Sequence, residues 1–367
     1  MRLYCAELYK LLCRKFFLIS SVLVLGLLFV YFWFVNVGDE RSVVDGQVYT
    51  GIQAVRTDRE ITKEYAGTLT DRKAKEIIDE YGFPSEVEEY YGGFRDENYL
   101  NGFVTEQLGN GYMRDWEDYE ISTALYPMEQ TELGKAARIT GEDILFDYTG
   151  GWSALLDTLQ MGMILGSILI LIGVSPVFAE ERQNKTEALL LTSAEGRDGD
   201  VRAKTAAAFT LAVLVYFAVA LFIFLAVGAV YGFSGSDCML GLVKGYYLNV
   251  SYTETMTSVG GFAALILVLD FLALNTLCAV TICVSACFRT TFHAVVVSCA
   301  VWIGPLLFRI ICRGGGYLLL AGTPLFLVMP GVVLDIYRVL FIPISVAVGS
   351  FVFCTYIGLN RYSTNVI

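Results

Sequence analysis

The chain has 367 residues, of which 55% are hydrophobic and 17% charged, and its formal net charge is −11. Soluble globular proteins carry about 25% charged residues, so this composition excludes an ordinary cytosolic enzyme. The high apolar content excludes a disordered chain, and the acidic balance excludes a basic nucleic-acid-binding protein. We therefore expect a membrane protein with no nucleic-acid partner.

Long apolar stretches determine the predicted fold class. About 20 apolar residues cross ~30 Å of hydrocarbon as a helix, and helices satisfy their own backbone inside lipid. The first stretch is too long for a cleaved signal, so we expect a membrane anchor there. The sequence predicts an all-α polytopic membrane protein with six spans, at residues 16–37, 155–180, 205–231, 258–287, 291–312 and 337–359.

The distribution of Lys and Arg predicts the orientation, because short cytoplasmic loops are enriched in these residues. The basic residues gather before the first span, between the second and third, at Arg289, and at Arg361 after the last. Both termini are then cytoplasmic in the cell membrane. The predicted cytoplasmic segments are 1–15, 181–204 and 360–367, and the predicted outside segments are 38–150, 232–257 and 313–335.

Residues 38–150 form an acidic insert between the first two predicted spans. They hold 25 acidic and 11 basic residues, a net charge of −14, and no cysteine. Apolar spacing predicts a mainly helical domain, with one helix over 71–81 between Thr70 as N-cap and Gly82 as stop, and another over 99–108. Its ten tyrosines form either a small aromatic core or a surface for a substrate or partner.

The first 15 residues predict an interfacial helix. Tyr4, Leu8, Leu11 and Leu12 recur at helical spacing, and charged residues lie mostly on the other side. Such an amphipathic helix lies on the inner membrane surface.

The most informative segment follows the second predicted span. A charged triplet, Glu180-Glu181-Arg182, is followed by Thr186, which can cap a short helix with apolar residues at 188–191. A half-exposed apolar helix either rests on the bilayer or docks against another protein.

This segment resembles the motif that follows the second membrane helix in permeases of type-2 ABC exporters. The matching residues are Glu180, Glu181, Arg182, Thr186, Leu189, Leu190 and Thr192. The resemblance implies that they couple the chain to separate ABC ATPase subunits, which bind ATP and Mg²⁺. It also implies a second permease chain, identical or related, a peptide, drug or ion substrate, and a re-entrant segment over 313–335.

Catalytic motifs are absent from the sequence. It contains no G-x-x-x-x-G-K-[ST] loop for ATP and has a single histidine, so we expect no enzyme activity, cofactor or metal in this chain. Asp270, with Asn275 five residues on, is the one charged residue within its predicted span. It lies on a translocation surface or at an ion or proton site, or it forms a structural hydrogen bond to a neighbouring helix, as a pair with Arg309 or Arg338.

Two other functions remain open from the sequence. One is a gradient-driven secondary transporter that uses Asp270. The other is a membrane receptor or assembly protein that acts through residues 38–150.

Overall fold

A computed structural model gives the fold of the chain. It describes residues 2–84, 96–109, 124–186, 199–246, 248–249, 251, 253–311 and 323–364. Helices dominate, and the two sheets of the described residues have two strands each. The predicted all-α class, with six helices apolar enough to span a membrane, is confirmed.

The chain divides into two compact units. The first comprises Met1–Phe29, Asp157–Ile223 and Leu265–Ile367, and the second comprises Val30–Leu156 and Phe224–Ala264. Four long helices, α2, α7, α10 and α11, continue from one unit into the other.

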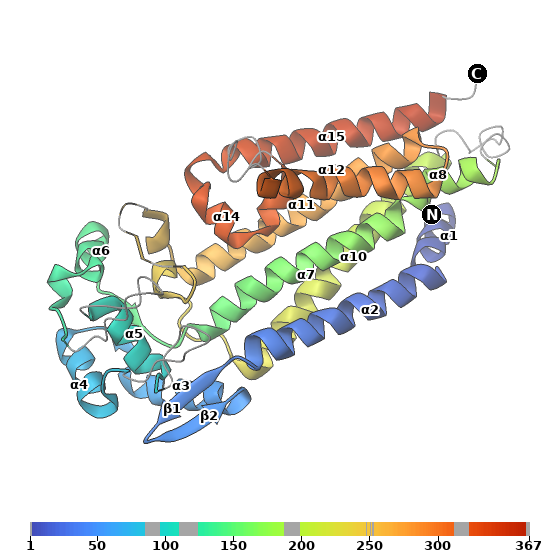
Figure 1. The fold of residues 1–367 in the computed structure, drawn as a ribbon. Coiled ribbons are helices and arrows are strands. Elements are labelled where there is room, and N and C mark those ends of the chain that lie inside the picture. The colour runs from blue at the N-terminus through green and yellow to red at the C-terminus, as the bar shows by residue number, and fades with distance from the viewer. Residues whose placement is uncertain are drawn as a thin grey trace. The chain divides into compact units, whose positions relative to one another are not determined.

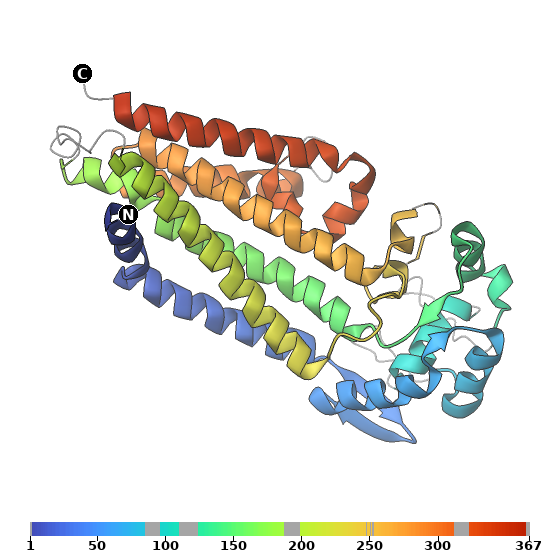
Figure 2. The same cartoon turned by 180° about the vertical axis from the view of Figure 1, so that it is seen from behind.

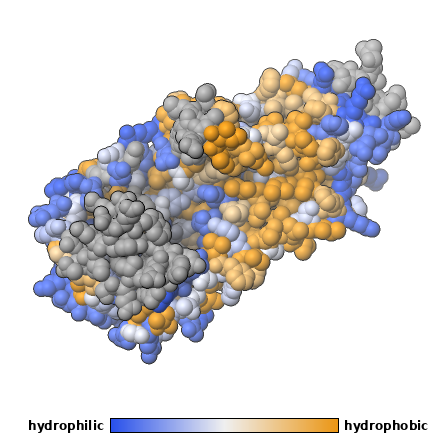
Figure 3. Space-filling model, viewed as in Figure 1, coloured by the Kyte–Doolittle hydropathy of each residue, from blue (hydrophilic) through white to orange (hydrophobic). Residues whose placement is uncertain are grey.

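Packed helices make up the first unit (Figure 1). They are α1 (Arg2–Leu12), α2 (Lys15–Tyr31), α7 (Gly150–Val174), α8 (Pro176–Gln183), α10 (Gly199–Val230), α11 (Val259–Cys287), α12 (Thr291–Ile311), α14 (Pro330–Asp335) and α15 (Phe341–Thr364). In the most apolar 18-residue stretch of each membrane-length helix, 72% of the residues are buried for α7 and 67% for α11. For α2, α12 and α15 the share is 17%. Helices α7 and α11 are therefore central, and Figure 3 shows a broad apolar surface on the face of the helices that it draws.

Helices α11 and α15 run side by side in both ribbon views (Figures 1 and 2). The Thr276 hydroxyl donates to the Leu272 carbonyl of its own helix at 2.8 Å and also lies 3.3 Å from the Ala347 carbonyl oxygen, so a shared hydrogen bond links the two helices.

The second and third spans differ from their predicted limits. Helix α7 begins at Gly150 rather than at 155, and it ends at Val174 because Pro176 has no amide hydrogen to continue the ladder. Helix α10 begins at Gly199, so the end of the predicted 181–204 loop is helical. Its first turn contains Asp200, where a carboxylate favours a helix N-terminus.

The last span also differs. Helix α15 begins at Phe341 rather than at 337, because Pro343 is tolerated in a first turn but not in a helix interior. It continues to Thr364, so most of the predicted 360–367 tail is helical.

Two further segments add detail to the predicted layout. The first span ends as a π-helix, Phe32–Val37. Of the predicted re-entrant segment, residues 313–322 lie outside the described residues, and the rest forms the 3-10 helix η5 (Pro324–Val328) followed by α14. Re-entrance itself stays a prediction.

The second unit contains strands as well as helices. Strand β1 (Arg41–Val44) pairs antiparallel with β2 (Gln47–Thr50), and β3 (Gly67–Thr68) pairs with β4 (Leu145–Phe146). Asp45 and Gly46 close the β1–β2 hairpin with φ of +52° and +73°. The sequence analysis did not predict this hairpin, although Asp-Gly between apolar residues favours such a turn.

The helices of this unit are α3 (Ile52–Tyr65), α4 (Asp71–Tyr81), α5 (Tyr99–Leu108) and α6 (Glu132–Thr140). The predicted helices over 71–81 and 99–108 are confirmed. The Thr70 hydroxyl oxygen accepts a hydrogen bond from the Lys73 amide at 3.3 Å, and Gly82 ends α4 with φ of +71°. Helices α3 and α6 were not predicted.

One apolar core holds this unit together. Its buried members come from α3 to α6, β4 and the segments between them, and also from the predicted 232–257 loop, which contributes Met239 and Leu242. Tyr65 and Tyr148 are buried, which supports the core interpretation of the tyrosines.

Candidate functional site

The first of the predicted coupling residues lie on a helix that the structure describes. Glu180, Glu181 and Arg182 lie on α8, and Thr186 follows it after two residues. Leu189, Leu190 and Thr192 lie outside the described residues. The described part of the site is therefore the base of the predicted coupling segment.

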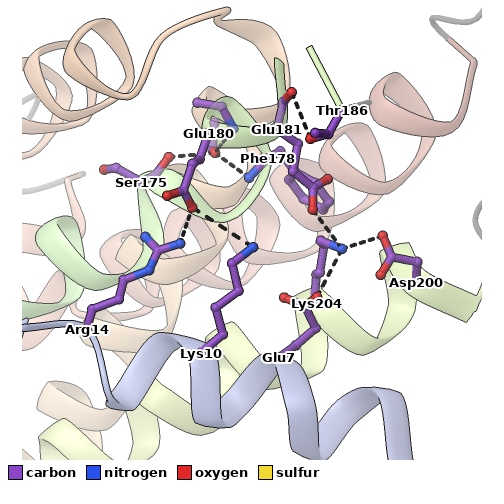
Figure 4. Close-up of polar contacts among 12 residues, drawn as sticks. Glu7, Lys10, Arg14, Ser175, Phe178, Glu180, Glu181, Thr186, Asp200 and Lys204 are labelled. Atoms are coloured by element: carbon purple, nitrogen blue, oxygen red, sulfur yellow. Dashed lines mark hydrogen bonds and ion pairs between the residues drawn. The ribbon is translucent and has the colours of Figure 1, made fainter. Parts of the chain in front are cut away.

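A buried lysine is the centre of this base. The Lys204 side chain of α10 is 1% exposed, and its Nζ lies 3.0 Å from Glu181 Oε1 and 3.3 Å from Glu7 Oε1. It also pairs with Asp200, one turn earlier on α10. Figure 4 shows the three carboxylates converging on this ammonium, whose three N–H donors match them in number.

Glu181 connects this cluster to the last helix. Its second carboxylate oxygen accepts a hydrogen bond from the Tyr362 hydroxyl of α15. The Tyr362 ring lies 4.3 Å from the Phe178 ring, and the Arg182 guanidinium lies over it at 5.3 Å. Arg182 also donates to the Ala286 carbonyl of α11. Helix α8 is thus fixed to α10, α11 and α15 by polar contacts.

Glu180 points to the other side, toward the N-terminal helix. It pairs with Arg14, and the Lys10 ammonium lies 4.0 Å from the same oxygen. The Glu180 side chain is 38% exposed, so solvent weakens these pairs relative to the buried Lys204 cluster. Together, Glu180 and Glu7 attach α1 to α8 and α10 (Figure 4).

A serine on α11 stabilises the break between α7 and α8. The Ser285 hydroxyl donates to the Ser175 carbonyl at 2.7 Å and accepts from the Phe178 and Ala179 amides at 3.0 and 3.1 Å. Helix N-termini leave amides without intrahelical partners, and here one fully buried hydroxyl binds two of them. The direction of α8 is therefore set by α11.

The end of α8 sets the direction in which the chain leaves it. Lys185 has φ of +57°. The Thr186 amide donates to the Glu181 carbonyl at 3.0 Å, and the Lys185 amide donates to Arg182 at 3.2 Å. These two bonds form a Schellman motif. The Thr186 hydroxyl also donates back to Glu181, at 3.3 Å, and a role of Thr186 as cap of a following helix stays a prediction.

The structure does not bring Asp270 and Asn275 together with this cluster or with each other. Asn275 donates to the Phe271 carbonyl on its own helix, at 2.8 Å. Asp270 is fully buried in α11, and neither carboxylate oxygen has a hydrogen-bond partner among the described residues. Among the described side chains, the structural hydrogen bond considered for Asp270 is therefore not formed, and a pair with Arg309, whose side chain lies outside them, stays a prediction.

Several residues of the site were not singled out from the sequence. Glu7, Asp200, Lys204, Ser285 and Tyr362 come from four different helices. Only the Asp200–Lys204 pair, at i and i+4, has a local sequence signal. The others are joined by tertiary packing alone.

Comparison with known protein families matches residues 3–337 to the ABC-2 family transporter proteins. No match was found among curated proteins or among solved structures. The family match covers most of the chain, includes the Lys204 cluster up to α11, and agrees with six helices of membrane-spanning length. The chain belongs to the ABC-2 transporter family and is a multi-pass membrane permease component of an ABC transporter.

Proposed function

We propose that this chain is the membrane-spanning subunit of an ATP-driven exporter. Two permease chains, identical or related, form the translocation pathway, and separate ABC ATPase subunits bind ATP and Mg²⁺. The segment after α8, with Leu189 and Leu190, docks on an ATPase. The observation that carries this proposal is the Lys204 cluster, because it makes a rigid base for that segment.

The charge distribution supports an orientation for this arrangement. The basic residues before α2, around 182–204 and at Arg361 favour a cytoplasmic location by the positive-inside rule. The Lys204 cluster and both termini then face the cytoplasm of a cell membrane. The acidic insert faces outside, where its net charge of −14 favours cationic substrates or partners.

The contacts of α8 support a mechanism for this coupling. An ATPase that moves the docked segment pulls on α8, whose charged side chains are held by neighbouring helices. Glu180 passes the displacement to the α1 end through Arg14, and Glu181 passes it to α10 and α15. Packed helices with two discrete arrangements can convert such a small shift into a change of the pathway.

The proposal is tested by placing a charge on the docking segment. In Leu190→Asp the permease folds, because the residue lies on the predicted docking face, but it loses the ATPase and ATP-dependent transport. The readouts are the amount of ATPase that co-purifies and the rate of Mg-ATP hydrolysis in lipid.

A matched control separates docking from a general effect of a new carboxylate. Ile139 of α6 is 54% exposed and lies in the acidic insert. Ile139→Asp should retain the ATPase and its activity. Full ATPase binding and activity in Leu190→Asp would contradict the coupling role of this segment.

A further inference from the structure

Asp270 is a buried acid that the proposed coupling does not use. It is the twelfth residue of the 29-residue helix α11, and it has no exposed surface. Both carboxylate oxygens lack a hydrogen-bond partner within the described parts of the chain. This arrangement is unfavourable for the stability of the fold, so it calls for a functional explanation.

Several polar side chains on α7, α11 and α12 do have hydrogen-bond partners. Asn275 and Thr276 donate to carbonyl oxygens of their own helix, each at 2.8 Å. Trp302 donates to the Ser167 hydroxyl at 3.0 Å. A carboxyl group kept for structure would have a partner of this kind, and Asp270 has none among the side chains that the structure describes.

Among the described residues, Tyr216 of α10 is the titratable side chain that interacts electrostatically with Asp270. Its hydroxyl donates to the Leu267 carbonyl at 2.9 Å, so its proton is not directed to the carboxyl. Its ring lies against Phe271, with centroids 5.3 Å apart. In the part of the chain that the structure describes, no Lys or Arg forms an ion pair with Asp270.

The surroundings determine which ligand this carboxyl can hold. An ionised carboxylate without a partner is strongly disfavoured in an apolar interior, and the group takes up a proton instead. The site has no accessible surface, which excludes a hydrated metal ion or an organic amine in this conformation. A proton needs no cavity, and it removes the unfavourable charge.

We propose that Asp270 is a proton-binding site whose occupancy controls the packing of α11. With the proton bound, α11 packs as described. When water reaches the side chain, the O–H bond breaks, the proton passes to water and the electron pair stays on the carboxylate. The ionised group then holds α11 in a hydrated conformation. This goes beyond ATPase coupling, because it adds proton uptake and release to the permease chain itself.

Infrared spectroscopy of the full chain in lipid vesicles tests the bound proton. At neutral pH the spectrum should contain the carbonyl stretch of protonated carboxyl groups, to which Asp58, with a pKa of about 7, also contributes. Asp270→Asn should lose the part of this band that comes from Asp270. The matched control is Asp157→Asn, which changes an exposed carboxylate on α7 and should leave the band in place. Absence of a band that depends on Asp270 would overturn the proposal.

Amide hydrogen exchange of α11 tests the control of packing. In the hydrated conformation of α11 the Asp270 carboxyl is ionised. If reaching this conformation releases one proton, its population rises about tenfold per pH unit. The ratio of exchange rates in the wild type and Asp270→Asn should rise with pH in the same proportion. Asp270→Ala cannot ionise either, so it must behave like Asp270→Asn.

The outcomes are separable from those of the coupling proposal, since no ATPase is present in either measurement. A ratio that stays constant with pH would show that the carboxyl does not control α11, and the proposal would fail. Loss of ATPase binding in the Leu190 variant would leave both of these results unchanged.

Discussion

At position 204 a single ammonium group lies among three carboxylates and is almost fully buried. Removing one member of a buried ion cluster leaves charges without a partner, which destabilises the folded state by about 3–5 kcal/mol. Lys204→Met should therefore lower the thermal stability of the detergent-solubilised chain by an amount of this order. Thermal unfolding measured by a Trp or thiol probe gives the change.

The comparison variant for Lys204 lies on α6. Lys135 pairs with Glu132, but its side chain is 50% exposed, so Lys135→Met should change stability by less than about 1 kcal/mol. Adding Asp200→Asn to Lys204→Met should restore part of the loss, because one unpaired carboxylate is removed. Equal effects of the two lysine variants would show that the cluster does not stabilise the fold.

Asp58 of α3 gives the second unit a pH dependence. Burial raises the pKa of Asp58 to about 7, against hydrogen bonds from the Ser42 hydroxyl and the Tyr99 amide, and nearby Glu40 and Glu97 raise it further. The folded state therefore binds this proton more tightly than the unfolded state. The stabilising effect is complete below about pH 4 and is lost as the pH rises to about 7.

The neutral variant Asp58→Asn keeps an acceptor for both hydrogen bonds and cannot titrate. Thermal unfolding between pH 4 and about 7 should show a decline in the wild type that is smaller in this variant. Parallel curves for the two proteins would contradict the pKa of Asp58 in the folded state.

At the scale of elements, the break between α7 and α8 depends on one hydroxyl. Ser285→Ala removes the acceptor of two amides and the donor to Ser175. Each buried group left without a partner costs about 1–3 kcal/mol, so the variant should be clearly destabilised. Ser21→Ala, whose hydroxyl only donates to Phe17 on its own helix, should be nearly neutral in the same unfolding measurement.

The long helices could be predicted because uninterrupted apolar runs admit only one stable structure in lipid. The ends of these helices could not be predicted, since they depend on single proline and charged residues that the apolar pattern does not register. Helix α15 begins near Pro343, which is tolerated only in a first turn, and the Asp200–Lys204 pair lies in the first turns of α10. The Asp45-Gly46 hairpin could not be predicted from apolar periodicity, because its signal is the turn dipeptide itself.

The site was only half predictable. The Glu180–Arg182 triplet is visible in the sequence, but its partners are distant: Arg14 lies 166 residues from Glu180, and Tyr362 lies 181 residues from Glu181. No periodicity relates such positions, and only helix packing brings them together. That Asp270 has no hydrogen-bond partner in the described part of the chain is likewise a tertiary property.

For the whole molecule, the orientation makes a direct prediction. Ile139 is exposed in the insert and Cys5 is exposed on α1. A membrane-impermeant maleimide should label Ile139→Cys in intact cells, because the insert is outside, and should reach Cys5 only after permeabilisation. The reverse pattern would contradict the proposed topology and the location of the Lys204 cluster.

The central claim is that a separate ATPase drives this chain through the segment after α8. Its most direct test is affinity purification of the full chain from its native membrane in mild detergent, with mass spectrometry and a Mg-ATP hydrolysis assay. The account predicts a stoichiometric partner that contains a G-x-x-x-x-G-K-[ST] loop and is lost in Leu190→Asp. A stable chain that purifies alone, with no ATPase in any preparation, would contradict it.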